Sequence, residues 1–563
     1  MKNSFAVSLL PFLTVSSLSL QGCTGPDTPE SIENAGVSLV AQQDNSWYIE
    51  SAAQVADTNN YIKSINTSAG AAKNIILFIG DGMSISTVTA ARILEGQQKG
   101  MSGEENSLSF GRFPFTGLAK TYNVDAQTPD SAGTMTAIIS GVKTDIGVIG
   151  VDENVVLEDC SSTAENTVVT ALELAEIAGL STGIISTARV THATPAAVYA
   201  KSASRDWEDN SDMPALAIEQ GCEDIASQLV NFEANLESQF SHLDIDGIDL
   251  VMGGGRRHFL PADASANSGD AASEIEGDRT DGRNLIAEWQ ATYPAGSYIE
   301  DQQGFDALQA HGSGPVLGLF NESHMLYEAD RGNDIAGEPS LTQMTQKAID
   351  ILDNNQKGFF LVVESGRIDH GHHASSAFNA LTDTIEFSDA IQAAVDSTDE
   401  AETLIIVTAD HGHVFTIAGY PKRGNPMLGK VIYPGSDEYA LASDGLPYTT
   451  LGYANGPGFH DFSAASNDQG FHSLGSVTDA DTVYRAELFM GRADLSAVDT
   501  ESSGFHQESS VPMRSETHSG EDVAVYATGP GSHLVSGTQE QSGIFHVMNY
   551  AGNLVAKAQA ALQ

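Results

Sequence analysis

The chain has 563 residues, which excludes a peptide hormone or a small scaffold and leaves room for a large core with an appended module. Hydrophobic residues make up 41% of the chain and charged residues 18%, a balance typical of a globular protein. The formal net charge is −49, and because so acidic a surface repels nucleic acid, we expect no nucleic-acid-binding role.

The first 22 residues are predicted to be a secretory signal peptide. Lys2 precedes an uncharged apolar run over residues 5–20, which is too short to span a bilayer as a mature helix. The run ends in Leu20-Gln21-Gly22-Cys23, which resembles a bacterial lipobox, where the cysteine is lipidated and becomes the mature N-terminus. Ordinary cleavage, with Cys23 left free or lost, is the alternative. We therefore expect an exported protein, periplasmic or on the cell surface, that a lipid on Cys23 attaches to a bacterial membrane.

Residues 23–68 are expected to form a lipid-anchored tether that ends in a helix. Residues 24–45 are rich in Pro, Ser, Gln and Asp, as flexible linkers are. Residues 47–65 carry apolar side chains at helical spacing. Such a tether would hold the following domain away from a membrane.

The other two cysteines, Cys160 and Cys222, are predicted to form one disulfide. Export places the chain in an oxidising compartment, and this even pair remains once Cys23 carries the anchor. Two free buried thiols are the alternative.

From residue 74 onward, apolar β-rich runs alternate with helical stretches. Strands are predicted at 74–79, 181–186, 248–252, 358–363 and 403–408, and helices at 167–178, 344–353 and 382–394. The strands are almost continuously apolar, as strands covered by helices on both faces are. The fold class is therefore predicted to be α/β: a three-layer α/β/α sandwich with a central, mostly parallel, doubly wound sheet over residues 69–563.

Between about residues 419 and 508 the helical period disappears in a stretch rich in Gly, Tyr, Ser, Asp and His. This composition predicts a loop-rich module inserted into the α/β domain. The β pattern then resumes at 521–528, which is predicted to be the final strand.

Acidic and histidine side chains gather just after the predicted strands, where open α/β sheets form their ligand crevice. These residues are Asp81 after the first strand, Glu364, Asp369, His370 and His373 after the strand at 358–363, Asp410, His411 and His413 after the strand at 403–408, and His518 just before the final strand. Taken singly, each one is explained as a cap, a turn residue or a solvated polar group. Four clusters of the same chemistry instead favour a zinc or magnesium site, and paired divalent ions about 4 Å apart are a known device for phosphoryl transfer.

Ser131 is the predicted nucleophile. Small residues follow it and favour a helix that begins beside its hydroxyl, and a helix N-terminus favours an anionic phosphate. A simple N-cap at Asp130 or Ser131 is the alternative. His192 and Thr194 lie near another strand end, and Arg205, which follows them, has a guanidinium able to bind two phosphate oxygens, with a surface ion pair as its alternative.

These stretches together resemble the alkaline phosphatase family over nearly the whole mature chain, from about Lys73 to Ala551. The segments at 86–94, 253–257, 455–458 and 520–525 look most similar to the animal and marine bacterial branch of that family. The resemblance implies hydrolysis of phosphate monoesters to an alcohol and inorganic phosphate through a phosphoserine, with activity greatest at alkaline pH.

The resemblance also implies a role for each residue of the site. Ser131 becomes the phosphoserine and Arg205 clamps the phosphate. The implied cofactors are two Zn²⁺ and one Mg²⁺, with the first zinc on Asp369, His373 and His518, the second on Asp81, Asp410 and His411, and the magnesium on Asp81, Thr194 and Glu364 with His192 nearby. His370 and His413 are implied to orient the ligands and the phosphate.

The family further implies a homodimer in which the inserted module is a crown that covers the entrance or the subunit interface, and a pair equivalent to Cys160 and Cys222. Its animal branch has a calcium site, which Phe320 matches, but Asn321 and Glu338 stand where Glu and Asp are expected, so calcium is doubtful here. Two alternatives to the monoesterase stay open: a phosphodiesterase or phosphonate hydrolase of the same superfamily, and a surface lipoprotein that binds phosphate or metal without turnover.

Overall fold

The computed structural model describes residues 60, 62–64, 67–240, 242–310, 312, 314–459 and 494–563. The predicted signal peptide, the lipidation site Cys23 and nearly all of the tether lie outside these residues, as does the part of the predicted crown at 460–493. Of the predicted N-terminal helix, residues 60 and 62–64 are described and are helical.

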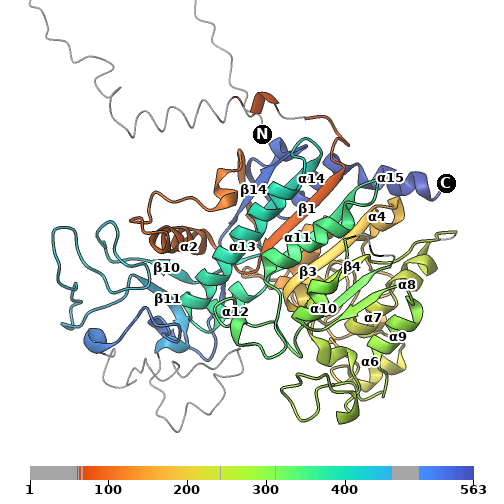
Figure 1. Ribbon diagram of the computed structural model, residues 1–563, viewed down its shortest axis with the longest axis horizontal. Helices are drawn as coiled ribbons and strands as arrows, with labels where there is room; N and C mark the ends of the chain where they lie inside the picture. The colour runs from red at the N-terminus through yellow and green to blue at the C-terminus, as the bar shows by residue number, and fades with distance from the viewer. Residues whose placement is uncertain are drawn as a thin grey trace, which may run out of the picture. The chain divides into compact units, whose positions relative to one another are not determined.

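A mostly parallel sheet of ten strands forms the centre of the described residues, in the order β15-β2-β14-β8-β1-β7-β3-β4-β6-β5 (Figure 1). The strands are β1 (Asn74–Gly80), β2 (Phe115–Lys120), β3 (Ser181–Arg189), β4 (Leu250–Gly254), β5 (Ser297–Ile299), β6 (Val316–Leu319), β7 (Phe359–Ser365), β8 (Thr403–Thr408), β14 (Val523–Thr528) and β15 (Gly537–Glu540). Only β14 pairs antiparallel with its neighbours in this sheet. The predicted α/β fold class is confirmed.

Helices cover the sheet in two layers. One layer consists of α3 (Ser131–Ser140), α4 (Ala171–Ala178), α14 (Gly543–Gly552) and α15 (Leu554–Ala561), and the other of α2 (Ile85–Gln98), α11 (Leu341–Leu352), α12 (Arg367–His373) and α13 (Ala377–Ser397). Figure 1 shows α11 and α13 running together across the strands. Shorter helices complete the far end of the sheet: α5 (Ala193–Ala196), α6 (Ala215–Glu219), α7 (Ile225–Val230), α8 (Phe232–Gln239), α9 (Leu285–Thr292) and α10 (Gln302–Ala307).

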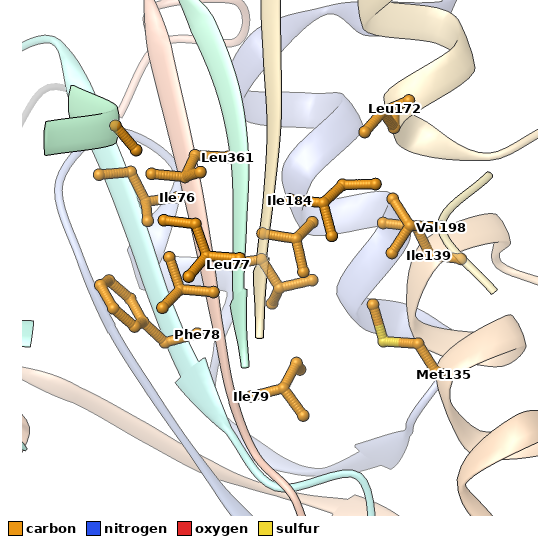
Figure 2. Packing of buried hydrophobic residues seen from close by; sticks show 14 of the residues in the cluster. Ile76, Leu77, Phe78, Ile79, Met135, Ile139, Leu172, Ile184, Val198 and Leu361 are labelled. Atoms are coloured by element: carbon orange, nitrogen blue, oxygen red, sulfur yellow. The ribbon is translucent and has the colours of Figure 1, made fainter. Parts of the chain in front are cut away.

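The central strands β1, β7 and β8 are buried along their whole length, as their continuous apolar sequences require. Phe78 of β1 packs edge-on against Phe387 of α13, with ring centroids 5.9 Å apart. Figure 2 shows Ile184 of β3 directed toward Leu172 and Val198. The core therefore occupies both faces of the sheet, and the loops at the strand ends are left to carry polar groups.

Helix caps explain where the observed helices differ from the predicted ones. The helix predicted at 167–178 begins only at Ala171, because Thr170 caps it in a capping box with Glu173. The helix predicted at 344–353 begins earlier, at Leu341, because Ser340 and Gln343 form the same type of box.

The predicted final strand is not the last one. Strand β14 lies within 521–528 as expected, but β15 follows it and pairs in parallel with β2 at the edge of the sheet. The short sequence of β15, Gly-Thr-Gln-Glu, has no apolar run that could have identified it, since an edge strand needs no buried faces.

Two small sheets accompany the large one. Strands β10 (Phe415–Ile417), β11 (Leu451–Gly456) and β12 (Ser509–Pro512) form one of them, and β9 (Gly412–His413) pairs with β13 (His518–Ser519) in the other. In the sequence, β10 and β12 lie on either side of the predicted insertion, and β11 lies within it. Among the described residues, no helix combines the length and hydrophobicity needed to cross a membrane.

Candidate active site

Three adjacent parallel strands bring carboxylates to one edge of the sheet. The register pairs Ile79 of β1 with Glu364 of β7 and with Thr408 of β8. Asp81 and Asp410 follow the ends of β1 and β8, so they lie beside Glu364 at this edge. All three side chains are completely buried. The strand-end residues that the sequence singled out are thus brought together.

Ser131 is the first residue of α3, and Asp130 caps this helix by accepting a hydrogen bond from the backbone N–H of Gly133 at 3.1 Å. The hydroxyl of Ser131 lies 3.0 Å from Nε2 of His411. The predicted helix start and the alternative, an Asp130 cap, are therefore both present. The hydroxyl faces the strand-end carboxylates from the positive end of a helix dipole.

Asp369, His373 and His518 form a first group. Nε2 of His373 and Nε2 of His518 each lie 3.4 Å from Oδ1 of Asp369, and 3.2 Å from one another. Asp369 and His373 are four residues apart on α12, and β13 carries His518 to them. Burial lowers the pKa of His373 to about 4, so its imidazole is neutral and able to bind a metal.

Asp81, Asp410 and His411 form a second group. Nε2 of His411 lies 3.4 Å from Oδ1 of Asp81 and 3.4 Å from Oδ2 of Asp410. The imidazole of His411 forms a hydrogen bond with neither carboxylate. Burial and the negative charge of Asp410 raise the pKa of Asp81 well above its usual range. Burial lowers the pKa of His411. Two carboxylates held this close repel each other unless a cation lies between them.

Asp81 also belongs to a third group, with Glu364 and His192, in which one ligand atom of each lies within 4.8 Å of the others. Thr194 is completely buried on α5, two residues after His192. Burial, followed by the charge of Asp410, raises the pKa of Glu364 to about 8, and burial lowers that of His192 to about 3.

The donor atoms of all three groups suit divalent cations, and in the second and third groups several of these atoms also lack a partner among the described residues. Both carboxylate oxygens of Asp81, Oε1 of Glu364 and Nδ1 of both His192 and His411 are buried without a hydrogen-bond partner in the described part of the chain. An unpaired buried polar atom costs about 1–3 kcal/mol, and more when it is charged. Carboxylate oxygens and neutral imidazoles are the donors that zinc and magnesium use, so bound cations would satisfy these atoms.

Arg205 lies against the cap of α3. Its Nη1 donates to Oδ2 of Asp130 at 3.0 Å, and its Nη2 lies 3.3 Å from Nε2 of His192. The expected ion-pair alternative is thus present, with Asp130 as the partner. Because Asp130 also holds the first turn of α3, this ion pair fixes the guanidinium close to Ser131.

The two histidines expected to orient ligands have defined partners. Nε2 of His413 lies 2.8 Å from Oδ1 of Asp369, and Nδ1 lies 2.5 Å from Oε2 of Glu516. Burial opposes the charge, but Glu516 and Asp369 raise the pKa of His413 to about 10. His370 contacts Arg367 through Nδ1 at 3.1 Å. His413 therefore donates to two carboxylates at once and fixes the orientation of Asp369.

Cys160 and Cys222 form a disulfide, with Cα atoms 5.9 Å apart, so the predicted pairing is confirmed. At the position that matches the calcium site of the animal branch, where calcium is doubtful here, Nδ2 of Asn321 donates to Oε1 of Glu338 at 2.6 Å. Burial raises the pKa of Glu338 to about 7.

The family model described as alkaline phosphatase matches residues 72–554, more than four-fifths of the chain. The chain belongs to the alkaline phosphatase family. The tissue-nonspecific alkaline phosphatase of Gallus gallus is 42% identical over 483 residues, which cover 85% of this chain and 84% of the relative. That of Rattus norvegicus is 40% identical over 547 residues, which cover 96% and 93%. The protein is therefore an enzyme of a metal-dependent phosphatase family.

Solved structures of other alkaline phosphatases share the fold. The enzyme from the Antarctic bacterium TAB5 matches with a TM-score of 0.52 and 22% identity, covering 86% of this chain and 99% of its own. The Thermus thermophilus enzyme matches with a TM-score of 0.58 and 20% identity, covering 89% and 97%. At these sequence identities, the structural similarity shows only that this alkaline phosphatase family member shares their fold.

Two residues of this alkaline phosphatase site, Glu516 and His324, were not predicted from the sequence. Glu516 accepts from His413, and its backbone oxygen lies 2.6 Å from Nδ1 of His373, so it orients two histidines. Its place two residues before His518 was the available signal. The ring of His324 packs at a tilt against that of His370, with ring centroids 4.1 Å apart, and no local motif distinguishes His324.

Proposed function

We propose that the protein hydrolyses phosphate monoesters at alkaline pH through a phosphoserine formed on Ser131. One observation carries the proposal: the Ser131 hydroxyl lies at the N-terminus of α3, 3.0 Å from His411 and facing three carboxylate–histidine groups that fit divalent cations. A hydroxyl alone is a weak nucleophile, so its burial beside these groups points to activation.

The proposed metal ligands divide into three sets, which are Asp369, His373 and His518 for one Zn²⁺, Asp81, Asp410 and His411 for a second Zn²⁺, and Asp81, Glu364 and Thr194 with His192 for Mg²⁺. When bound, these ions supply the positive charge that favours an ionised serine hydroxyl, stabilises the leaving oxygen and makes water acidic. The first set offers two imidazole nitrogens and the second offers one with two carboxylates, donors that zinc uses. The third set offers mostly oxygen atoms, which magnesium prefers.

The chain's own residues position both displacements. Ser131 Oγ forms a bond to phosphorus while the bond from phosphorus to the ester oxygen breaks, and the alcohol leaves. Water then attacks the phosphoserine, inorganic phosphate leaves, and the hydroxyl of Ser131 is restored. Arg205, held by Asp130, has guanidinium N–H groups left to bind the phosphoryl oxygens through both steps.

The expected pH dependence of turnover follows from the two nucleophiles, the hydroxyl of Ser131 and water. Loss of a proton from the serine hydroxyl and from water is favoured as pH rises, so turnover should increase toward the alkaline side. His413 stays protonated there, since its pKa is raised to about 10 after the opposing effect of burial, and keeps Asp369 oriented.

The test compares an aryl phosphate monoester with the matching diester from neutral to strongly alkaline pH, first with a chelator and then with added Zn²⁺ and Mg²⁺. We expect alkaline, chelator-sensitive release of the phenol from the monoester, and a phosphorylated Ser131 peptide in acid-quenched samples. Preference for the diester would instead establish a phosphodiesterase or phosphonate hydrolase, and silence despite bound zinc would establish a non-catalytic binding lipoprotein.

We further propose that the enzyme is exported, is anchored by a lipid on Cys23 in the periplasm or at the cell surface, and forms a homodimer whose crown lies near the entrance. The disulfide between Cys160 and Cys222 supports the export, because such bonds persist in oxidising compartments. Metabolic labelling with a radioactive fatty acid, lost in Cys23→Ser, tests the anchor, and sedimentation of the purified enzyme tests the dimer.

A further inference from the structure

A second mixed cluster of carboxylates and imidazole lies outside the candidate active site. Asp209, His258 and Asp278 each offer one ligand atom within 4.8 Å of the others. They come from three separate segments: the loop before α6, the short helix Arg256–Phe259 after β4, and the acidic stretch that follows it. Neither the sequence motifs nor the proposed function uses any of them.

His258 is the centre of this cluster. It is 94% buried, and its Nδ1 lies 2.6 Å from Oδ2 of Asp209. Its Nε2 has no hydrogen-bond partner in the described part of the chain, although Oε2 of Glu208 is 3.2 Å away. A buried ring nitrogen held beside carboxylates without bonding to them points to a missing ligand.

The two carboxylates beside His258, those of Glu208 and Asp209, differ in their partners. Glu208 is neutralised by Arg189, whose Nε and Nη2 donate to it at 2.8 and 2.6 Å. Asp209 is completely buried, and beyond His258 its side chain accepts from the backbone N–H of Ser211 at 2.7 Å.

Asp278 is the exposed member of the cluster. Its side chain is 42% exposed, and the nearest cationic atom, Nε of Arg257, is 3.8 Å away. Arg257 also bonds to Glu322 at 3.2 Å, so its charge is shared. Among the described residues, neither Asp209 nor Asp278 therefore has a lysine or arginine within hydrogen-bond distance.

We propose that Asp209, His258 and Asp278 bind a divalent transition-metal cation, Zn²⁺ or Mn²⁺. An imidazole with two carboxylates is a donor set for such ions, whereas Ca²⁺ and Mg²⁺ prefer oxygen ligands alone. The exposure of Asp278 provides an entry path and open positions for water. The cation ties the loop that carries Asp209 to the acidic stretch that carries Asp278, and this proposal does not rest on the proposed catalytic function.

The test counts metal per chain. The full-length enzyme and the variants Asp278→Asn and His258→Asn are stripped with chelator, dialysed against Zn²⁺ or Mn²⁺ alone, and analysed for metal content. Matched controls are Asp396→Asn, an exposed aspartate on α13, and His546→Asn, an exposed histidine on α14. We expect each cluster variant to hold one equivalent of metal fewer per chain than the wild type and both controls, while hydrolysis of an aryl phosphate is unchanged.

Asp278→Asn decides the outcome by itself if His258→Asn fails to fold, because Asp278 is half-exposed and, among the described residues, its carboxylate makes only the distant contact with Arg257. Equal metal contents in the wild type and Asp278→Asn would overturn the proposal. A smaller rise in melting temperature on adding Zn²⁺ to Asp278→Asn than to Asp396→Asn would support the cation independently.

Discussion

Two regions of this protein bury carboxylates in opposite ways. At the candidate active site, Asp81, Glu364 and Asp410 are completely buried side by side, and the chain brings no lysine or arginine into an ion pair with them among the described residues. Beyond β4, Arg256 is almost completely buried between Glu276 and Asp270, with bonds of 2.5 and 2.8 Å.

Arg279, like Arg256, is a buried arginine that pairs with carboxylates. Arg279 donates to both oxygens of Asp224 at 2.9 and 3.1 Å and to Asp281 at 2.5 Å. Burial opposes the charge of Arg256 and Arg279, but their carboxylate partners raise the pKa of both guanidinium groups above the usual range. The comparison shows that the arginine-paired carboxylates beyond β4 stabilise the fold within the chain, whereas the three at the candidate active site lack such a partner and fit a cation from outside the chain.

The largest expected effect is a loss of turnover without a loss of stability. Ser131→Ala should lower the turnover of a phosphate monoester by about 10³-fold or more, because no other hydroxyl takes its place at the N-terminus of α3. The melting temperature of the metal-loaded enzyme should stay close to that of the wild type. Near-native turnover with metals bound would show that Ser131 is not the nucleophile.

The second prediction concerns pH in the absence of metal. Burial raises the pKa of Glu364 to about 8, so the protonated side chain favours the folded state at low pH, and this contribution is lost as pH rises from the usual value near 4.5 through about 8. In chelator, Glu364→Gln should therefore gain stability over the wild type by up to about 4 kcal/mol between pH 5 and pH 9. Urea unfolding of both proteins at several pH values measures the difference.

Added Zn²⁺ and Mg²⁺ should reverse this result, because bound cations stabilise the ionised form of Glu364 in the wild type alone. Parallel stability–pH curves for the two metal-free proteins would contradict the view that this carboxylate lacks a partner within the chain.

The third prediction concerns the region with internal arginines. Glu276→Gln removes the charge that pairs with buried Arg256 and should cost about 3 kcal/mol of unfolding free energy while leaving kcat/KM for a monoester unchanged at a temperature where the variant is folded. Glu288→Gln is the matched control, since its pair with Arg283 lies at the surface, where the two side chains are 41% and 36% exposed, and should be worth less than about 1 kcal/mol. Equal effects of the two substitutions would remove the distinction between the regions.

The smallest expected effect concerns the net charge of −49, which opposes the approach of an anionic substrate. Salt screens the distant surface charges more than the buried site, so raising NaCl from low to moderate concentration should increase kcat/KM about twofold. Sucrose at matched osmolality is the control. A fall in kcat/KM with salt would show that the local positive field at the site dominates association.

Much of the site could be predicted from the local sequence, because the end of a buried strand is visible as the end of an apolar run. Asp81, Asp410 and His411 each follow an apolar run, and parallel strands must place such residues at one edge. Glu516 could not be predicted in the same way, because it acts on His413 and His373 across a distance of more than a hundred residues and belongs to no strong motif. Its partners are determined by the pairing of β9 with β13.

The sequence by itself determined the α/β class, the central strands, the family and the pairing of Cys160 with Cys222, because hydrophobic runs, motifs and an even cysteine pair are local features. Only the tertiary structure decided which buried carboxylates have an arginine partner. Glu276 and Glu364 are both acidic residues in the printed sequence, but one packs against Arg256 and the other against Asp81 and His192. That difference arises from how distant segments pack, and the energetic cost of an unpaired buried charge is what distinguishes a site for cations from a structural ion pair.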